Sequence, residues 1–300
     1  MNIPAMRAVK ETYPDAKITL AVSAEAKELA EIVEYADKVM VWDDDFRKSL
    51  RRLKFDACVI LNPAKEAHLA TFLAGIPLRV GYNRKWGILL TKKIADNKGL
   101  GLKHEVESNL ELVSLIGAKT NDKSISLERL PAYNNPEYTG AVAVHPYTSD
   151  VVKQWPLERF MELAGRIAQE LKSKVVLVGR VEDRGQSPSD APRRIGSAGA
   201  PPPAGTVPLG VIDLINKTSL VELAQILKQC SLLVTCDSGP MHLAAAVGTP
   251  VVALFRNDIP GKAARRWGPW GEGHSVIEKS SLSNIIVDEV FNKAKEMLKK

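Results

Sequence analysis

The residues best suited to bind a ligand lie in one turn of the second half of the chain, Asp-Ser-Gly at 237–239. An apolar run, Leu232–Cys236, precedes this turn as a strand would. Pro240 follows it and can open a helix, because the first helical position needs no N–H. Free N–H groups and the positive end of the helix dipole then point outward. Gly239 lets a ligand approach the backbone closely, and His242 can donate to a phosphate or a sugar hydroxyl. We therefore expect a pyrophosphate site here.

Two interpretations of this turn remain open. Asp237 is not expected to contact phosphate, because like charges repel; a ligand hydroxyl or backbone N–H groups suit it better. In the alternative, Asp237 and Ser238 only cap the helix, and His242 lies on the surface. Just upstream, Ser219 and Glu222 have the spacing of a capping box and predict where the preceding helix starts.

A second strand end carries similar side chains. The apolar run 141–144 leads into His145, and Thr148, Ser149 and Lys153 follow before an amphipathic helical pattern. Small hydroxyl donors and a mobile positive charge are groups that bind phosphate. A lysine near a helix start is also common as a solvated surface residue, so this motif leaves that alternative open.

These two loops belong to a strand–helix alternation that runs along most of the chain. It predicts parallel sheets covered by helices on both faces, with the ligand site at the carboxyl ends of the strands. Helical patterns lie at 24–34 and 46–53, and Pro and Asn residues at 130–138 indicate a linker between two doubly wound α/β domains, 1–135 and 136–300. The expected buried strands are 18–22, 39–42, 57–61, 141–144, 175–178, 232–236 and 251–255.

One stretch, 182–210, departs from this pattern, since it is rich in proline and contains no lysine. A long segment without periodicity is unusual inside a compact domain. We expect a flexible insertion, or a locally altered reading frame in the gene.

The amino-acid composition limits the classes of protein to which this chain can belong. Of the 300 residues 45% are apolar and 25% charged, as in a folded soluble protein, and neither a membrane-spanning run nor a signal peptide is expected. The three cysteines, Cys58, Cys230 and Cys236, lack CxxC spacing and are expected to be buried reduced thiols, which favours the cytoplasm. A formal charge of +6 suits an acidic partner: nucleic acid, an anionic membrane or a phosphorylated substrate.

Basic side chains gather on the predicted helix 46–53 and continue at Lys65, Arg84 and Lys85. They form either a solvated face or an electrostatic landing site for acceptor phosphates, sugar-acid carboxylates or anionic lipid. A nucleic-acid module is not expected, because these residues are not interleaved with exposed aromatic residues. A nicotinamide-dependent oxidoreductase would need GxGxxG between a strand and a helix, and Gly99-x-Gly101 lacks the third glycine.

Further motifs complete a pattern that covers most of the chain outside 182–210. Together with the two loops above, it resembles glycosyltransferase family 9, the ADP-heptose:lipopolysaccharide heptosyltransferases. The matching pieces are Ile-Pro-Ala-Met-Arg-Ala at 3–8, Arg-Val-Gly-Tyr at 79–82, His-Glu at 104–105, His-Pro at 145–146 with Lys-x-Trp-Pro at 153–156, and Asp-Ser-Gly-Pro-Met-His at 237–242.

The resemblance implies a GT-B fold, with two doubly wound Rossmann-like domains facing a central cleft. The acceptor, an acidic lipopolysaccharide inner core, is implied on 1–135, and the donor, ADP-heptose, on 136–300, which carries the C-terminal helix. It also implies an inverting displacement without metal or cofactor, in which a carboxylate deprotonates the acceptor hydroxyl and ADP leaves. Groups that donate to the leaving diphosphate then accelerate the reaction more than they tighten binding.

Carried over residue by residue, the resemblance implies that Thr148 and Ser149 contact the diphosphate and Lys153 neutralises it. Lys153 and His242 are the side chains expected to take part in catalysis, and Lys65 is expected to bind the acceptor. The other implied donor-binding residues are Asp237, Ser238, Gly239 and His242, Thr218 near the base of the nucleotide, and Glu182 or Asp183 on the ribose.

Members of the family begin with a strand and a Gly-Asp loop before the Pro-Ala helix, whereas Met1 already stands at that helix. The strand and the aspartate that serves as the family's base are not in this sequence, so we assign no catalytic base; Asp150 belongs to the donor side. The alternative function is therefore a catalytically inactive nucleotide-sugar-binding remnant. The expected place is the cytoplasm, with peripheral contact to the inner face of the inner membrane.

Overall fold

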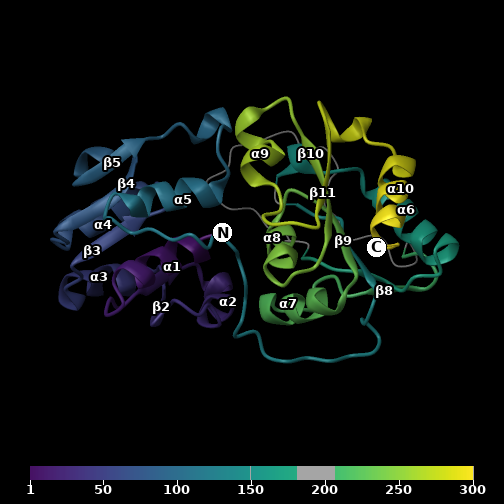
Figure 1. The fold of residues 1–300 in the computed structure, drawn as a ribbon, viewed down its shortest axis with the longest axis horizontal. Coiled ribbons are helices and arrows are strands. Elements are labelled where there is room, and N and C mark those ends of the chain that lie inside the picture. Colours follow the sequence, from purple (N-terminus) through teal and green to yellow (C-terminus); the bar gives the residue numbers. More distant parts are fainter. Residues whose placement is uncertain (149, 181–206, 300) are drawn as a thin grey trace. The chain divides into compact units, whose positions relative to one another are not determined.

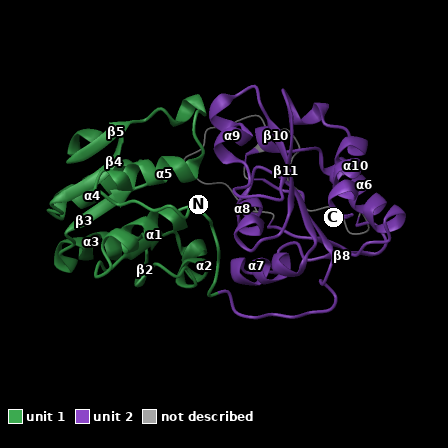
Figure 2. Cartoon of the chain, in the orientation of Figure 1, with its two compact units in different colours: residues 1–129 green, residues 130–300 purple. Residues whose placement is uncertain are grey.

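The computed structural model describes residues 1–148, 150–180 and 207–299. The chain divides into two compact units, Met1–Arg129 and Leu130–Lys300 (Figure 2). The segment expected as a linker, 130–138, falls in the second unit. There the backbone N–H of Asn135 donates to the side-chain oxygen of Gln229 at 2.8 Å.

Unit 1 is built from short parallel strands and helices. Its strands form two sheets, β1–β2 and β3–β4–β5, in which every pairing is parallel. The strands are β1 (Thr19–Val22), β2 (Lys38–Val41), β3 (Ala57–Ile60), β4 (Leu78–Asn83) and β5 (Lys92–Ala95). The helices are α1 (Ile3–Thr12), η1 (Ala24–Ala26), α2 (Lys27–Glu31), α3 (Asp44–Leu53), α4 (Lys65–Leu73), η2 (Gly87–Leu89), η3 (Lys98–Leu100) and α5 (Glu105–Ser114).

Strands are present close to the expected ranges 18–22, 39–42 and 57–61, but the expectation that these strands are buried is wrong. Most side chains of β1, β2 and β3 are half-buried or exposed, and only Ile60 is buried. Within the described residues β1 pairs with β2 alone, so each strand of this sheet keeps one open edge. Two strands, β4 and β5, were not expected, although Arg-Val-Gly-Tyr of β4 was singled out as a motif.

Helix α3 shows how local chemistry places the basic residues of unit 1. The carboxylate of Asp43 caps the helix by accepting from the N–H of Phe46 at 2.8 Å. Its first turn carries acidic residues and its last turn Arg51 and Arg52, which matches the helix dipole. Phe46 and Leu50 are buried, so the arginines remain on the outer face.

Unit 2 contains one six-stranded parallel sheet in the order β11–β10–β9–β6–β7–β8 (Figure 1). Its strands are β6 (Val142–His145), β7 (Val175–Leu177), β8 (Val211–Asp213), β9 (Leu232–Cys236), β10 (Val251–Arg256) and β11 (Ser275–Lys279). Its helices are η4 (Val151–Lys153), α6 (Leu157–Glu170), α7 (Leu220–Gln229), α8 (Gly239–Ala246), η5 (Pro260–Lys262), α9 (Ala264–Trp267), η6 (Leu282–Asn284) and α10 (Val287–Met297). Helices α6 and α10 lie on one side of the sheet and α8 on the other (Figure 1).

The core of unit 2 fixes the central strands firmly. Strands β6 and β9 are buried along their whole length, as continuous apolar strands under helices should be. Trp155, which is fully buried, donates its indole N–H to the carbonyl of Ile285 at 3.0 Å and so ties the start of α6 to the segment before α10. The loops that follow β6 and β9 therefore leave a rigid sheet.

The stretch 182–210 is described only in part. Residues 181–206 lie outside the described residues, so the expected insertion is not tested there. At its end, the expectation of a flexible insertion does not hold for two residues: Val207 packs against the core of unit 2, and Pro208 lies against Gly165 of α6. The short strand β8 follows, and its pairing with β7 accounts for this packing.

Candidate functional site

The two loops singled out in the sequence leave the same edge of the unit 2 sheet. Strands β6 and β9 are parallel neighbours, with His145 opposite Thr235 in the register. The loop containing Thr148 and Lys153 follows β6, and the turn at 237–239 follows β9. Because both leave carboxyl ends of adjacent strands, their side chains can act on one ligand.

The first direct link between the loops is an ion pair between Lys153 and Asp237. Asp237 is 8% exposed and Lys153 is mostly covered. The ammonium of Lys153 also lies 5.9 Å from the ring centroid of Trp267. The alternative of a solvated surface lysine is therefore not what the structure shows, because a buried carboxylate pairs with Lys153 at the sheet edge.

A second lysine–aspartate pair lies beside the first and was not expected from the sequence. Lys262 of η5 donates to a carboxylate oxygen of Asp150 at 2.8 Å. Lys262 belongs to the loop after β10, the strand next to β9. The rule that ligands bind at strand ends, applied to β10 as well, could have pointed to Lys262 as a candidate, but not to its pairing with Asp150. Arg256, at the end of β10, donates to the carbonyl of Val152 at 3.2 Å and steadies the same loop.

The two pairs influence each other electrostatically. Burial raises the pKa of Asp237, against the opposing hydrogen bond and charge of Lys153. Burial also acts to raise the pKa of Asp150, but Lys262, the N–H of Val152 and the charge of Lys153 outweigh it and leave that pKa below its ordinary value. Each lysine is thus held by a carboxylate that a more highly charged anion could replace.

The alternative in which Asp237 and Ser238 only cap a helix is wrong. Ser238 occupies the N-cap position of α8, yet its side chain makes no capping hydrogen bond. Its hydroxyl lies 3.2 Å from Nδ1 of His145 and 3.1 Å from the hydroxyl of Thr235. The free N–H groups at the start of α8 therefore keep their capacity to bind an anion.

Space is open at this helix start. A Cβ added at Gly239 would meet no atom within 4 Å, so the backbone is accessible to a ligand. His242 lies one turn into α8 and is half-buried. At the other end of the helix, Gly248 has φ 82°, the left-handed C-terminal cap expected from the sequence.

The remaining donor-side candidates are less directly placed. The Thr148 hydroxyl donates to the carbonyl of Asp150 at 2.7 Å, so it helps to shape the loop. Thr218 is half-buried just before α7, which begins with the expected capping box of Ser219 and Glu222. Ser149, Glu182 and Asp183 lie outside the described residues.

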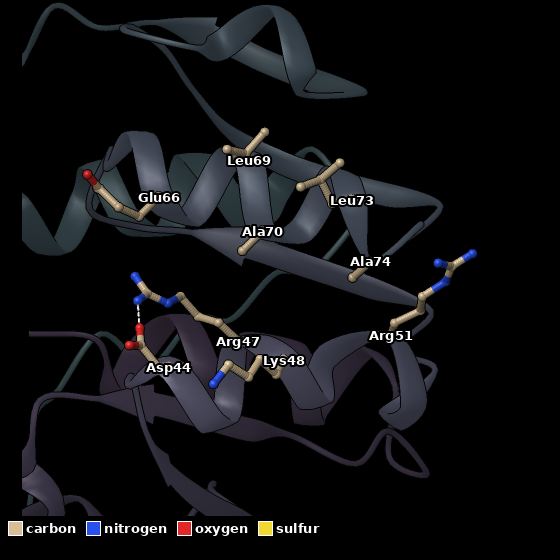
Figure 3. Close-up of a pocket in the computed structure, with 9 residues that line it drawn as sticks. All are labelled: Asp44, Arg47, Lys48, Arg51, Glu66, Leu69, Ala70, Leu73 and Ala74. Carbon is tan, nitrogen blue, oxygen red and sulfur yellow. Dashed lines mark ion pairs between the residues drawn. The ribbon is translucent and has the colours of Figure 1, made fainter.

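The acceptor-side candidate, Lys65, is exposed at the first position of α4 in unit 1. A cavity of about 550 Å³ lies between α4 and α3. Figure 3 shows its two walls: leucines and alanines of α4 face charged residues of α3, among them Arg47, which pairs with Asp44. The lining residues are Asp44, Arg47, Lys48, Arg51, Glu66, Leu69, Ala70, Leu73 and Ala74. This face is thus partly ion-paired rather than uniformly basic.

Outside the undescribed segments, no group of three or more His, Cys, Asp or Glu residues is arranged to hold a metal ion. Within the same described ranges, none of the helices has the length and apolar character needed to cross a membrane. Cys230 and Cys236 are buried free thiols, as expected, whereas Cys58 is only partly buried.

The chain is similar in sequence to heptosyltransferases. It is 23% identical over 301 aligned residues to lipopolysaccharide heptosyltransferase 3 of Escherichia coli (strain K12), covering 91% of this chain and 82% of that protein. It is 25% identical over 239 aligned residues to lipopolysaccharide heptosyltransferase 2 of the same strain, covering 71% of this chain and 63% of that protein.

Solved structures agree on the fold. The structure of E. coli ADP-heptose LPS heptosyltransferase II matches 99% of this chain and 94% of its own, with a TM-score of 0.73 and 20% identity. E. coli heptosyltransferase WaaC with ADP matches 99% and 95%, with a TM-score of 0.74 and 17% identity.

The family model of glycosyltransferase family 9 (heptosyltransferase) matches residues 44–285, which include both loops of the site. The resemblance seen in the sequence is thereby confirmed. The chain belongs to glycosyltransferase family 9, the heptosyltransferase family, and is a glycosyltransferase of the GT-B fold.

Proposed function

We propose that this chain is an inverting heptosyltransferase that transfers heptose from ADP-heptose to the inner core of lipopolysaccharide. The names of its relatives support this acceptor, and two similar structures support the donor, one with ADP and one with ADP-2-deoxy-2-fluoro heptose. The observation that carries the proposal is the paired arrangement of Lys153 and Lys262 at the strand ends where α8 begins.

The diphosphate of the donor would replace the carboxylates as the partner of both lysines. It would also accept from the N–H groups at Gly239 and from the hydroxyl of Ser238. The family resemblance adds Thr148 and Ser149 as further contacts of the diphosphate. Asp237, released from Lys153, would accept from a sugar hydroxyl. His242 would donate to the diphosphate or the sugar, while Thr218 and Asp183 would hold the nucleoside.

Transfer then follows from the charge that develops on the leaving group. As the bond from the anomeric carbon to ADP breaks, negative charge grows on the diphosphate. Lys153 and Lys262 stabilise that charge more strongly than they stabilise the bound donor. The acceptor hydroxyl attacks from the opposite face in a single displacement, which inverts the anomeric centre. We assign no residue to its deprotonation.

On the acceptor side, Lys65 and the arginines of α3 would attract the acidic core sugars and an anionic membrane surface. The protein would then work in the cytoplasm at the inner face of the inner membrane. Flotation with vesicles that contain anionic phospholipid checks this contact. The double variant Arg51→Glu with Arg52→Glu should no longer float with the vesicles. Unchanged flotation of this variant would contradict the proposed membrane contact.

Calorimetry with ADP, UDP and GDP, followed by an ADP-release assay with ADP-heptose and a lipopolysaccharide core acceptor, tests the function. We expect ADP to bind most tightly and to be released only when acceptor is present. Binding without transfer would support the alternative of an inactive nucleotide-sugar-binding protein. Preference for UDP or GDP would contradict the proposed donor.

A further inference from the structure

A buried histidine lies directly beneath the proposed donor site. His145 is the last residue of β6, the strand between β9 and β7, and is 5% exposed. Its Nδ1 lies 2.9 Å from the hydroxyl of Thr235 and 3.2 Å from the hydroxyl of Ser238. The ring therefore joins the interior of the sheet to the first residue of the ligand-binding turn.

The other edge of the ring is fixed by a glycine. Gly179 follows β7 with φ 131°, and a Cβ there would lie 2.6 Å from Cδ2 and 2.9 Å from Nε2 of His145. Only a residue without a side chain leaves room for the imidazole in this position. The ring is thus held between Gly179 on one side and two hydroxyl groups on the other.

The proton count of the three polar groups decides what Ser238 can do. The Thr235 hydroxyl lies 3.2 Å from the carbonyl of Cys236, which can only accept, and donates to it. If Nδ1 carries the proton of the neutral imidazole, Ser238 cannot donate to the ring, and its proton can turn to a ligand or to the Thr235 oxygen at 3.1 Å. If Nδ1 is bare, it accepts that proton, and Ser238 offers only lone pairs, which repel an anion.

We propose that His145 is a positioning residue that directs the hydroxyl proton of Ser238 toward the diphosphate of the donor. This inference rests on the proposed function, since it presupposes that Ser238 meets a diphosphate. Burial lowers the pKa of His145 to about 4, so the ring is neutral at physiological pH and acts through one N–H rather than through charge. Its sequence position suggested only a strand end, and the tertiary contacts give it this role.

Two replacements separate positioning from packing. Asn carries its amide group where the imidazole has Nδ1, whereas Gln carries it where the imidazole has Nε2. Both variants replace the imidazole ring with an open, neutral amide side chain, so both loosen the packing against Gly179. His145→Asn should therefore bind ADP within threefold of the unchanged protein, and His145→Gln about tenfold more weakly, as expected for loss of a hydrogen bond to a charged group.

Calorimetric ADP affinities in a double-mutant cycle give the decisive measurement. Ser238→Ala should weaken ADP binding about tenfold, and adding His145→Gln to it should cost less than a further twofold, because the two residues act as one unit. Losses that multiply to about a hundredfold, or equal losses in the Asn and Gln variants, would overturn the positioning role. If the unchanged protein binds no ADP, the proposed donor site fails and the inference fails with it.

A spectroscopic measurement on the ligand-free chain checks the contact itself. In protein labelled with ¹⁵N-histidine, Ser238→Ala should shift the Nδ1 resonance of His145. Ser231→Ala removes a hydroxyl just before the opposite end of β9, where it donates to the carbonyl of Gly140 at 3.0 Å, and should leave that resonance in place. If the Nδ1 resonance of His145 does not shift in Ser238→Ala, the proposal is overturned.

Discussion

Lys153 and Asp237 form a partly buried ion pair across 84 residues of sequence, joining the loops after two adjacent strands. The pair costs desolvation on both sides, and breaking it from one side leaves a buried charge without a counter-ion. In the proposed donor site this arrangement would keep a cation at the sheet edge until a donor binds. Replacing either Lys153 or Asp237 should therefore change both the activity and the free energy of unfolding, and the two effects need not be of similar size.

Lys153→Ala should lower the turnover number about 10²- to 10³-fold while changing donor affinity much less, since its contact strengthens as the diphosphate leaves. His242→Ala should behave in the same way. Steady-state kinetics and calorimetry measure the two effects. Lys228→Ala, on the exposed face of α7, is the matched control and should change neither. Turnover unchanged in both site variants would remove these residues from the mechanism.

Lys262→Met should weaken ADP binding about tenfold, equivalent to roughly 1.4 kcal/mol. Asp150→Asn removes the carboxylate that competes for this lysine and should tighten binding or leave it unchanged. Isothermal titration with ADP measures both variants. Lys279→Met is the comparison, because Lys279 of β11 is also paired, at 3.2 Å from Glu289, but should have no effect. Equal affinity for the Lys262 and Lys279 variants would exclude Lys262 from the donor site.

The pH dependence of stability should carry the signature of His145. Its pKa is lowered from 6.5 to about 4 by burial, so between these values the unfolded chain binds a proton that the folded chain does not. The free energy of unfolding should therefore rise with pH across this interval, by at most about 3.5 kcal/mol at roughly 1.4 kcal/mol per pKa unit.

Urea denaturation at pH 4.5 and 6.5 measures this rise. His145→Asn cannot titrate there and should reduce it. His274, whose pKa burial also lowers, contributes in the same direction and remains in both proteins. An equal rise in the two proteins would show that His145 is not the titrating group.

The sequence was most informative where local chemistry decides the structure. Strand β9 has the predicted bounds, and the capping box of Ser219 and Glu222 begins α7 as expected. Strands β5 and β11 were missed, because both mix apolar with charged side chains and lack a continuous apolar run. Their strand character comes from pairing with β4 and β10, which no local pattern records.

In the candidate site, too, local sequence patterns predicted some features, whereas others depend on contacts between distant segments. The turn at 237–239 and the loop around Lys153 could be found because each follows an apolar strand. The partner of each lysine could not, because Lys262 and Asp150 are 112 residues apart and meet only through the order of β6, β9 and β10. Whether a charge is solvated or held depends on such contacts, and charge alone does not distinguish the two.

Gly179→Ala should be considerably more destabilising than the corresponding substitution at Gly210, another glycine with positive φ. Gly179 and Gly210 both have positive φ, at 131° and 82°, so alanine is strained at each, by roughly 1–2 kcal/mol. A Cβ at Gly210 would meet nothing within 4 Å, whereas at Gly179 it would meet the ring of His145 at 2.6 Å. The difference between the two variants therefore contains the steric contact with His145 and the greater backbone strain at φ 131°.

Urea unfolding of the two alanine variants measures that difference, and we expect Gly179→Ala to cost about 1–3 kcal/mol more, the usual penalty for overpacking. Because the displaced ring carries Ser238 with it, ADP affinity should fall in Gly179→Ala and stay unchanged in Gly210→Ala. Combining Gly179→Ala with His145→Asn, which has no ring at that position, should restore part of the stability. Equal unfolding free energies for the two single variants would show that the imidazole can move aside at no cost, and that the glycine does not hold it in place.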